Sequence, residues 1–370
     1  MTYKTYIAVL VLSAAASFLL TPLARRVAVW LGAIDHPGER KIHTEPMPRL
    51  GGLAVFGGFC FPWGFFYLLD NRVTATFQNY ERLFAALVAG AVVMLALGVV
   101  DDVKGLRAAP KLAVQVAAAA GLYFGGYQID ALSNPFGPPI QLGGLALPVS
   151  VLWIVGITNA INLLDGIDGL AAGVTACIAL ALAAINVTYG NIIVALLTLC
   201  LAGACAGFLP HNFAPARIYL GDSGSLFLGL VLACIGILSL FKAATATFIA
   251  TPLILFALPL FDTTSVFVGR LWRGAPVFRG DRTHVHHRLL ALGLNHRQAA
   301  LFLYAITFLM GLAAVALTAR QTPVTLLVGG LLLALLLGAL GWHWRKRKGD
   351  EAQTDSPPPA HEAKTIRDQP

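Results

Sequence analysis

Charged side chains are scarce in this sequence. Asp, Glu, Lys and Arg make up only 12% of its 370 residues, about half of the ~25% that is typical of soluble domains. Hydrophobic residues make up 57%, and the mean hydropathy is +0.74. This composition excludes a soluble globular domain, a disordered chain and a collagen, and it predicts a protein that is embedded in a membrane.

Cysteine is also scarce, and its positions exclude a further class. The five cysteines lie inside apolar runs, and no two of them form a CxxC pair. This pattern excludes a secreted module held together by disulfides. We expect the cysteines to be small core residues rather than disulfide partners or zinc ligands.

Apolar runs of about 20 residues recur along the chain, and each is long enough to cross a hydrocarbon core as a helix. A membrane β-barrel would instead show alternating segments of about ten residues. We therefore predict an all-α polytopic membrane protein with about eleven transmembrane helices. The predicted spans are 5–23, 51–69, 83–100, 111–127, 147–164, 168–187, 191–209, 223–241, 247–268, 299–318 and 324–343. Residues 1–343 would form an integral membrane catalytic domain, and 344–370 a basic and then disordered cytoplasmic tail.

The distribution of Lys and Arg predicts the orientation. With the N-terminus outside, 21 of the 26 basic residues fall on the inside and five fall outside. Cytoplasmic loops of membrane proteins carry such an excess. We therefore expect a cytoplasmic C-terminus. Orientation and anionic lipids explain the net charge of +8, so it does not indicate a nucleic-acid partner.

Five aspartates fall at predicted cytoplasmic helix ends. Asp101 and Asp102 follow the third span, Asp165 and Asp168 separate the fifth from the sixth, and Asp222 opens the eighth. A carboxylate is costly to bury without a partner. N-capping of the next helix is the alternative for Asp168 and Asp222. The five together predict a shared site.

Several carboxylates at a membrane surface can bind a divalent cation. Magnesium typically takes one or two carboxylates together with substrate phosphate oxygens, and bound metal neutralises the charge of a departing phosphate. Lys104, Arg107 and Lys111 follow the Asp101-Asp102 pair and would neutralise phosphate as well. Ordinary positive-inside charge is the alternative for Lys104 and Arg107.

The segment 159–170 reads Asn-Ala-Ile-Asn-Leu-Leu-Asp-Gly-Ile-Asp-Gly-Leu. Asn162, Asp165 and Asp168 are three residues apart, so a continuing helix would place them on one face. Gly166 and Gly169 permit a turn or a close backbone approach. We interpret this segment as a nucleotide site in which Asn and Asp bind a uracil or a ribose.

Two further motifs follow. In Arg217-Ile-Tyr-Leu-Gly-Asp-Ser-Gly-Ser225 an aspartate stands at a helix start, where backbone amides and the helix dipole favour an anion. Asp281-Arg-Thr-His-Val-His-His-Arg288 lies in a basic inside loop. Its histidine spacing matches no common zinc site. Binding of phosphate or sugar oxygens is the preferred interpretation, and a solvated loop is the alternative.

Taken together and in this order, the motifs Asp101–Lys104, Asn159–Leu170, Gly221–Ser225 and His284–Arg288 resemble those of the polyprenyl-phosphate N-acetylhexosamine-1-phosphate transferases. The resemblance covers nearly all of residues 1–343. The HxHHR loop, with Arg49-Leu-Gly-Gly52, is similar to the branch that uses UDP-N-acetylglucosamine.

The resemblance implies roles for individual residues. Asp101 and Asp102 match the catalytic acidic pair, Asp222 matches the acid that coordinates magnesium, and Asn162 matches a metal-contacting position. Manganese is expected to substitute for magnesium. The substrate-binding residues that it implies are Lys111, Asp165, Asp168, Arg282, His284, His286, His287 and Arg288.

The implied reaction joins UDP-GlcNAc to undecaprenyl phosphate and yields GlcNAc-diphospho-undecaprenol and UMP, the first membrane step of a cell-envelope glycan pathway. The expected location is the bacterial inner membrane, among its lipids, with the active site on the cytoplasmic face. We favour a single displacement assisted by Asp101; a covalent aspartyl intermediate stays open. The oligomeric state is also open, and a homodimer is one alternative.

Other functions remain as alternatives. The nearest are the same reaction with another UDP-N-acetylhexosamine or with phospho-MurNAc-pentapeptide. An intramembrane prenyltransferase should carry two acidic motifs and no Asn-rich nucleotide segment. A transporter should place its polar site near the bilayer midplane, whereas these acids cluster at one predicted face.

Overall fold

The computed structural model describes residues 3–36, 46–68, 80–132, 134, 137–241, 250–272, 284–319 and 327, which are mostly helical. The helices are α1 (Tyr3–Leu31), α2 (Gly51–Tyr67), α4 (Glu81–Lys104), α5 (Ala108–Phe124), α6 (Ala146–Leu164), α7 (Leu170–Thr188), α8 (Ile192–Asn212), α9 (Gly221–Gly236), α10 (Ala250–Leu255), α11 (Ala257–Trp272), α12 (Val285–Ala291) and α13 (His296–Thr318). Two short antiparallel pairs join β1 (Ile34–Asp35) to β2 (Met47–Pro48) and β3 (Ala131–Leu132) to β4 (Ile140–Gln141).

Seven helices among these residues are long and apolar enough to cross a membrane: α1, α4, α6, α7, α8, α9 and α13. The helices α2 and α5 are apolar but shorter. The predicted class, a helical multi-pass membrane protein, is confirmed. The count of about eleven spans and the orientation stay predictions. The span 324–343 and the tail lie outside the described residues, apart from Leu327.

Two boundaries show how local sequence sets the helices. The first helix continues past the predicted end at residue 23, although it contains Pro22, and stops at Leu31, just before Gly32, which has a φ of 71°. The predicted break between the fifth and sixth spans is confirmed. There α6 ends at Leu164, and α7 begins after Gly169, whose φ is 78°. A left-handed conformation of this kind favours glycine.

The core of the molecule is built around α9. Every residue of this helix from Ser223 to Gly236 is buried. It packs against α4, α6, α2 and α7. The outer helices α1 and α4 bury a much smaller share of their length, as expected for helices that face lipid. The central helix thus has a fixed position from which its first turn can present polar groups.

Glycines let two helices come very close to the first turn of α9. A Cβ atom added to Gly52 of α2 would lie 2.2 Å from the backbone nitrogen of Gly224. One added to Gly98 of α4 would lie 2.3 Å from the Cα of Ser223. Small residues allow such backbone contact between membrane helices. The contacts place the ends of α2 and α4 directly beside Asp222.

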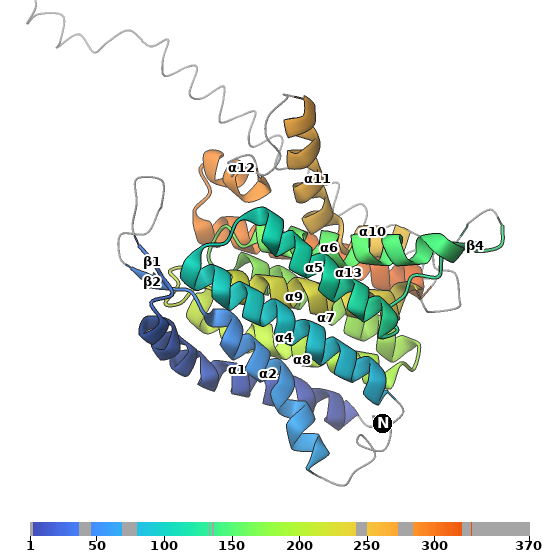
Figure 1. Cartoon of the computed structure of the whole chain (residues 1–370), viewed down its shortest axis with the longest axis horizontal. Coiled ribbons are helices and arrows are strands. Elements are labelled where there is room, and N and C mark those ends of the chain that lie inside the picture. The colour runs from blue at the N-terminus through green and yellow to red at the C-terminus, as the bar shows by residue number, and fades with distance from the viewer. Residues whose placement is uncertain are drawn as a thin grey trace, which may run out of the picture.

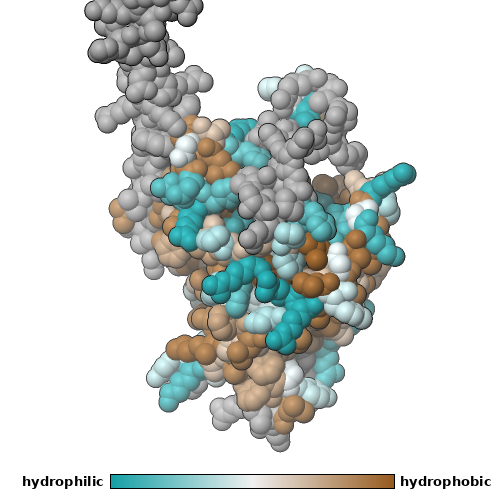
Figure 2. Space-filling view, turned by 90° about the vertical axis from the view of Figure 1, so that its left-hand side faces the viewer, coloured by the Kyte–Doolittle hydropathy of each residue, from teal (hydrophilic) through white to brown (hydrophobic). Residues whose placement is uncertain are grey.

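The polar elements gather at one end of the bundle. Figure 1 shows the β1–β2 pair and α12 at the end where α4 and α6 finish and α9 begins, and β4 at the opposite end. In the view onto the first of these ends, hydrophilic side chains spread across the middle of the face (Figure 2). Backbone hydrogen bonds from Gly51 N to Tyr219 O (3.0 Å) and from Tyr219 N to Pro48 O (2.8 Å) fasten the segment before α9 to this end.

Candidate active site

The carboxylate of Asp102 holds the start of α9. Its Oδ1 accepts a hydrogen bond from the backbone N–H of Asp222 (2.9 Å), and its Oδ2 accepts one from Ser223 (3.0 Å). The first amides of a helix have no partner within the helix and favour an anion. The anion predicted at this helix start is therefore a side chain of the protein itself, on the last turn of α4.

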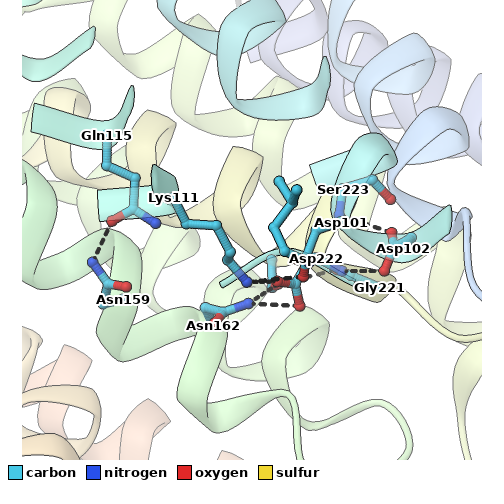
Figure 3. Close-up of polar contacts among 11 residues, drawn as sticks. Asp101, Asp102, Lys111, Gln115, Asn159, Asn162, Gly221, Asp222 and Ser223 are labelled. Carbon is cyan, nitrogen blue, oxygen red and sulfur yellow. Dashed lines mark hydrogen bonds and ion pairs between the residues drawn. The ribbon is translucent and has the colours of Figure 1, made fainter. Parts of the chain in front are cut away.

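Its neighbour Asp101 belongs to a separate cluster in which one cation contacts two acids (Figure 3). The Nζ of Lys111, on α5, lies 2.8 Å from Asp101 Oδ2 and also forms an ion pair with Asp222 Oδ2. The other oxygen of Asp101 accepts a hydrogen bond of 2.6 Å from the backbone N–H of Leu106. Three helices thus contribute one group each, and the three groups meet at the polar end.

Amide side chains of α6 complete the cluster. Asn162 donates to Asp222 Oδ1 (3.1 Å) and to the hydroxyl of Ser225 (2.8 Å). One turn deeper, Asn159 donates to the Oε1 of the buried Gln115 (2.6 Å). Figure 3 shows the Asn159–Gln115 contact, which joins α6 to α5, beside the Asn162–Asp222 contact, which joins α6 to α9. Asn162 and Asp222, which the resemblance assigns to one metal site, thus lie in hydrogen-bond contact.

The second acidic motif forms a turn rather than a continuing helix. Asp165 and Asp168 follow the end of α6 at Leu164, so the continuing helix that would place Asn162, Asp165 and Asp168 on one face does not form. The reason is the pair of glycines, which favours a turn over a helix. N-capping is wrong for Asp168: no side chain caps α7, and Asp168 Oδ2 instead accepts from the backbone N–H of Ala216 (2.9 Å). Nor does Asp222 cap α9, because it lies within the first turn.

A cavity of about 340 Å³ opens beside the cluster. Its lining includes Asp165, Asp168, Asp222, Arg49 and Tyr219. Burial, followed by the nearby charges of Asp222 and other acids, raises the pKa of Asp165 well above its ordinary value. The protonated, neutral form of Asp165 is therefore favoured. In that form the side chain is suited to donate a hydrogen bond rather than to bind a cation.

The residues of the histidine motif lie in different surroundings. Of its described members, His287 lines the cavity, whereas His286 is buried, at 2% exposure, against the turn that carries Asp165 and Asp168. A Cβ atom added to Gly166 of that turn would lie 2.3 Å from His286 Nε2. His284 lies beside Asp262 of α11, and Arg288 lies within α12. Arg282 lies outside the described residues.

The cluster has the donor set for a magnesium ion. In the part of the chain that the structure describes, no group of three or more His, Cys, Asp or Glu side chains has the arrangement of a metal site. Magnesium does not require one, since it usually binds one or two carboxylates plus phosphate oxygens and water. Asp101 and Asp222 already share one cation, the Lys111 ammonium. Their carboxylates, with Asn162 alongside, fit the ion.

Known proteins are similar to this chain over most of its length. Residues 84–240 match the model of glycosyl transferase family 4. The chain is 37% identical to the probable undecaprenyl-phosphate N-acetylglucosaminyl 1-phosphate transferase of Bacillus subtilis, over 86% of each chain. It is 36% identical to the decaprenyl-phosphate N-acetylglucosaminephosphotransferase of Mycobacterium tuberculosis, over 78% of this chain and 76% of that protein. This chain belongs to glycosyl transferase family 4.

Family membership confirms the resemblance that the ordered motifs predict. A further relative, the undecaprenyl-phosphate alpha-N-acetylglucosaminyl 1-phosphate transferase of Escherichia coli K12, is 28% identical over 86% of this chain and 87% of its own length. All four predicted motifs contribute to the polar end of this family 4 chain. The site roles of their residues stay predictions.

Four polar groups near this family 4 site received no individual role from the sequence. Arg49 pairs with Asp35, and both line the cavity. Burial raises the pKa of Tyr219 to about 12, so its hydroxyl stays protonated in the same lining. Asp262 is fully buried beside His284. Two of them had a signal in the sequence: Arg49 stands in the Arg49-Leu-Gly-Gly52 motif, and Asp262 is an ionisable residue inside a predicted span, where such residues are rare and functional.

Proposed function

We propose that this chain transfers N-acetylglucosamine 1-phosphate from UDP-GlcNAc to undecaprenyl phosphate, giving GlcNAc-diphospho-undecaprenol and UMP. One observation carries the proposal: Asp101, Lys111 and Asp222, from three helices, meet in one ion-paired cluster, and Asp222 also lines the cavity. The relatives, whose names specify N-acetylglucosamine 1-phosphate transfer to undecaprenyl or decaprenyl phosphate, support it.

The cavity is the proposed nucleotide site. Asp168, Asp165 and Tyr219 offer hydrogen bonds to a base or a ribose, while Arg49 offers positive charge to phosphate. His287 lines the same cavity and would contact the sugar diphosphate. Arg49 also has a structural role, because its ion pair with Asp35 holds the β1–β2 segment at the polar end of the bundle.

At the cluster, Asp222, Asp101 and Asn162 would hold the proposed magnesium ion. Bound there, the ion would neutralise charge that develops on the diphosphate as it breaks. Lys111 supplies a fixed second positive charge at the same place, because two carboxylates hold its ammonium. Asp102 keeps the first turn of α9, and with it Asp222, in position.

The proposed chemistry is a single displacement. An oxygen of the lipid phosphate attacks the phosphorus that carries the sugar, a new P–O bond forms, and the P–O bond to UMP breaks. Asp101 would accept the proton of the lipid phosphate, because its carboxylate stands at the polar end of a membrane helix, where a lipid head group can reach it. UMP leaves with the negative charge, which Lys111 stabilises.

The proposed location is the cytoplasmic face of a bacterial inner membrane. The excess of Lys and Arg in the predicted inside loops supports it, and so does the polar character of the end that carries the cavity (Figure 2). A UDP-sugar is charged and soluble in water, so it would reach the cavity from the aqueous side.

The test uses purified full-length protein with undecaprenyl phosphate and a panel of radiolabelled UDP-sugars, including UDP-GlcNAc, UDP-GalNAc and UDP-MurNAc-pentapeptide. We expect lipid product and UMP with UDP-GlcNAc. Asp101→Asn and Asp222→Asn should reduce UMP release at least ~100-fold. The matched control is Asp130→Asn, the same change at an exposed aspartate beside the β3–β4 pair, which should keep wild-type turnover. Turnover with another sugar and none with UDP-GlcNAc would overturn the proposed donor.

A further inference from the structure

Asp262 is the most completely buried acid whose place the proposed reaction does not explain. It lies on α11 with 0% exposure. A buried carboxylate is costly unless both of its oxygens are satisfied. Its Oδ2 lies 2.8 Å from the Nδ1 of His284, and its Oδ1 accepts a hydrogen bond of 2.7 Å from the backbone N–H of Val285. Both oxygens therefore bind consecutive residues, at the point where α12 begins.

This pairing fixes the ring of His284. The nitrogen that faces a carboxylate carries the hydrogen, so the ring has one tautomer and one orientation. The ring of His284 is stacked on that of His286, with centroids 5.8 Å apart and an interplanar angle of 6°. His286 in turn fills the space beside Gly166, where any side chain would collide with it. A continuous line of contacts thus runs from α11 through two histidines to the turn between α6 and α7.

The next residue in the chain is the one that reaches the cavity. His287 lines it together with Asp165 and Asp168, whose turn is contacted by His286. In Figure 1, α11 rises steeply from the bundle, and α12 stands beside it at the polar end. The contacts made by the first residues of α12 therefore help to orient it against the bundle, together with its packing on α13.

We propose that Asp262 is a positioning residue that anchors the histidine motif, so that His284 and His286 hold α12 in place and His287 alone of the three contacts the substrate. This assignment narrows the sequence prediction, which gives all three histidines a substrate-binding role. Its kinetic part rests on the proposed function, since it requires a UDP-sugar in the cavity.

The kinetic test compares Asp262→Asn with Thr264→Ala, which changes an exposed residue of the same helix whose hydroxyl donates to the backbone of its own helix. We expect Asp262→Asn to lower kcat/KM for UDP-GlcNAc at least ~10-fold, with a raised KM for the UDP-sugar and an unchanged KM for the lipid. Thr264→Ala should match the wild type. A fall in kcat with both KM values unchanged would overturn the proposal, because a merely structural role predicts that result.

A second measurement does not depend on turnover. Diethyl pyrocarbonate modifies accessible neutral histidines, and peptide mass spectrometry locates the label. In the wild type we expect label on His287 and protection of His284, whose side chain is only 8% exposed. In Asp262→Asn, labelling of His284 should rise several-fold, whereas Thr264→Ala should leave it unchanged. Equal labelling of His284 in all three proteins would overturn the anchor, even if UDP-GlcNAc proved not to be the donor.

If Asp262→Asn fails to fold, the contact between Asp262 and His284 can be tested by substituting His284 instead. His284→Asn keeps an amide that can donate to Asp262, and His284→Ala removes the donor. We expect His284→Asn to retain a lower KM for UDP-GlcNAc than His284→Ala. Equal KM values in the two variants would contradict the anchor.

Discussion

Asp102 binds through both carboxylate oxygens to the two backbone amides at the start of the helix that carries Asp222. The two neighbours in the acidic pair therefore have different tasks. Asp101 faces the Lys111 cation, and Asp102 keeps α9 against α4. The resemblance treats both as catalytic, and the contacts give one of them a clear architectural role as well.

This division predicts different effects of the same substitution at the two positions. Asp102→Asn removes the negative charge at the N-terminus of α9 and replaces one acceptor oxygen with a donor amide. It should destabilise the protein by about 1–2 kcal/mol. Asp101→Asn should lose activity with little loss of melting temperature. Thermal unfolding in detergent, beside UMP release, measures both, and equal melting temperatures would contradict the architectural role of Asp102.

A second prediction concerns the close approach of α2 to α9. Gly52→Ala would place a methyl group 2.2 Å from the backbone of Gly224, so one helix must move away from the other. Overpacking of this kind costs about 1–3 kcal/mol, and here it would also displace Asp222. Gly64→Ala, in the same helix, is the control because an added Cβ meets nothing within 4 Å.

We therefore expect Gly52→Ala to lower both the melting temperature and UMP release. Gly64→Ala should be neutral or slightly stabilising, since Ala favours helix over Gly. If both glycines tolerate alanine equally, the packing around the first turn of α9 is not as tight as the contacts indicate.

A third prediction separates nucleotide binding from lipid binding. Asp168→Ala removes an acid from the cavity lining and also the acceptor of the Ala216 N–H. We expect the KM for UDP-GlcNAc to rise at least ~10-fold, with a smaller change for undecaprenyl phosphate. Asp168→Asn keeps one acceptor oxygen and should fall between the wild type and Asp168→Ala. Equal changes in both KM values would remove the nucleotide role.

A fourth prediction follows from the burial of His286. Burial, followed by the charge of His287, lowers its pKa from 6.5 to about 4. The other groups that face it are Asp262, His284 and His296. The unfolded chain binds a proton at a higher pH than the folded chain. The folded state is therefore favoured fully above pH 6.5, and it loses up to a few kcal/mol as the pH falls from 6.5 toward 4.

The loss of melting temperature between pH 7 and pH 5 should thus be smaller in His286→Asn than in the wild type, because the variant has no group that must stay neutral. Melting curves of both proteins at the two pH values measure the difference. The same loss in both proteins would show that protonation of His286 does not contribute.

Much of this site could be predicted from the sequence. Acids are rare in so apolar a chain, so Asp101, Asp165, Asp168 and Asp222 were visible as a group, and the predicted span ends placed them at one end of the bundle. Charge and hydropathy patterns carry that information. The turn after Leu164 was harder to predict, because spacing alone does not decide between a helix and a glycine turn.

Other features depend on tertiary contacts, which cannot be predicted from the spacing of residues in the sequence. Asp102 and Asp101 are adjacent and identical in the sequence, and only the position of α9 separates their roles. Likewise, the pairing of Asp262 with His284 links residues 22 positions apart. The sequence indicates this pairing only through Asp262, an acid inside an otherwise apolar predicted span.

The central claim is that Asp101 and Asp222 hold a divalent cation at the polar end of the bundle. Binding of Mn²⁺ as a stand-in for Mg²⁺, followed by electron paramagnetic resonance in the presence of UDP-GlcNAc, tests it most directly. We expect the wild type and Asp130→Asn to bind Mn²⁺ that Mg²⁺ displaces, and Asp222→Asn to lose this binding at least ~10-fold. Unchanged Mn²⁺ binding in both Asp101→Asn and Asp222→Asn would contradict the claim.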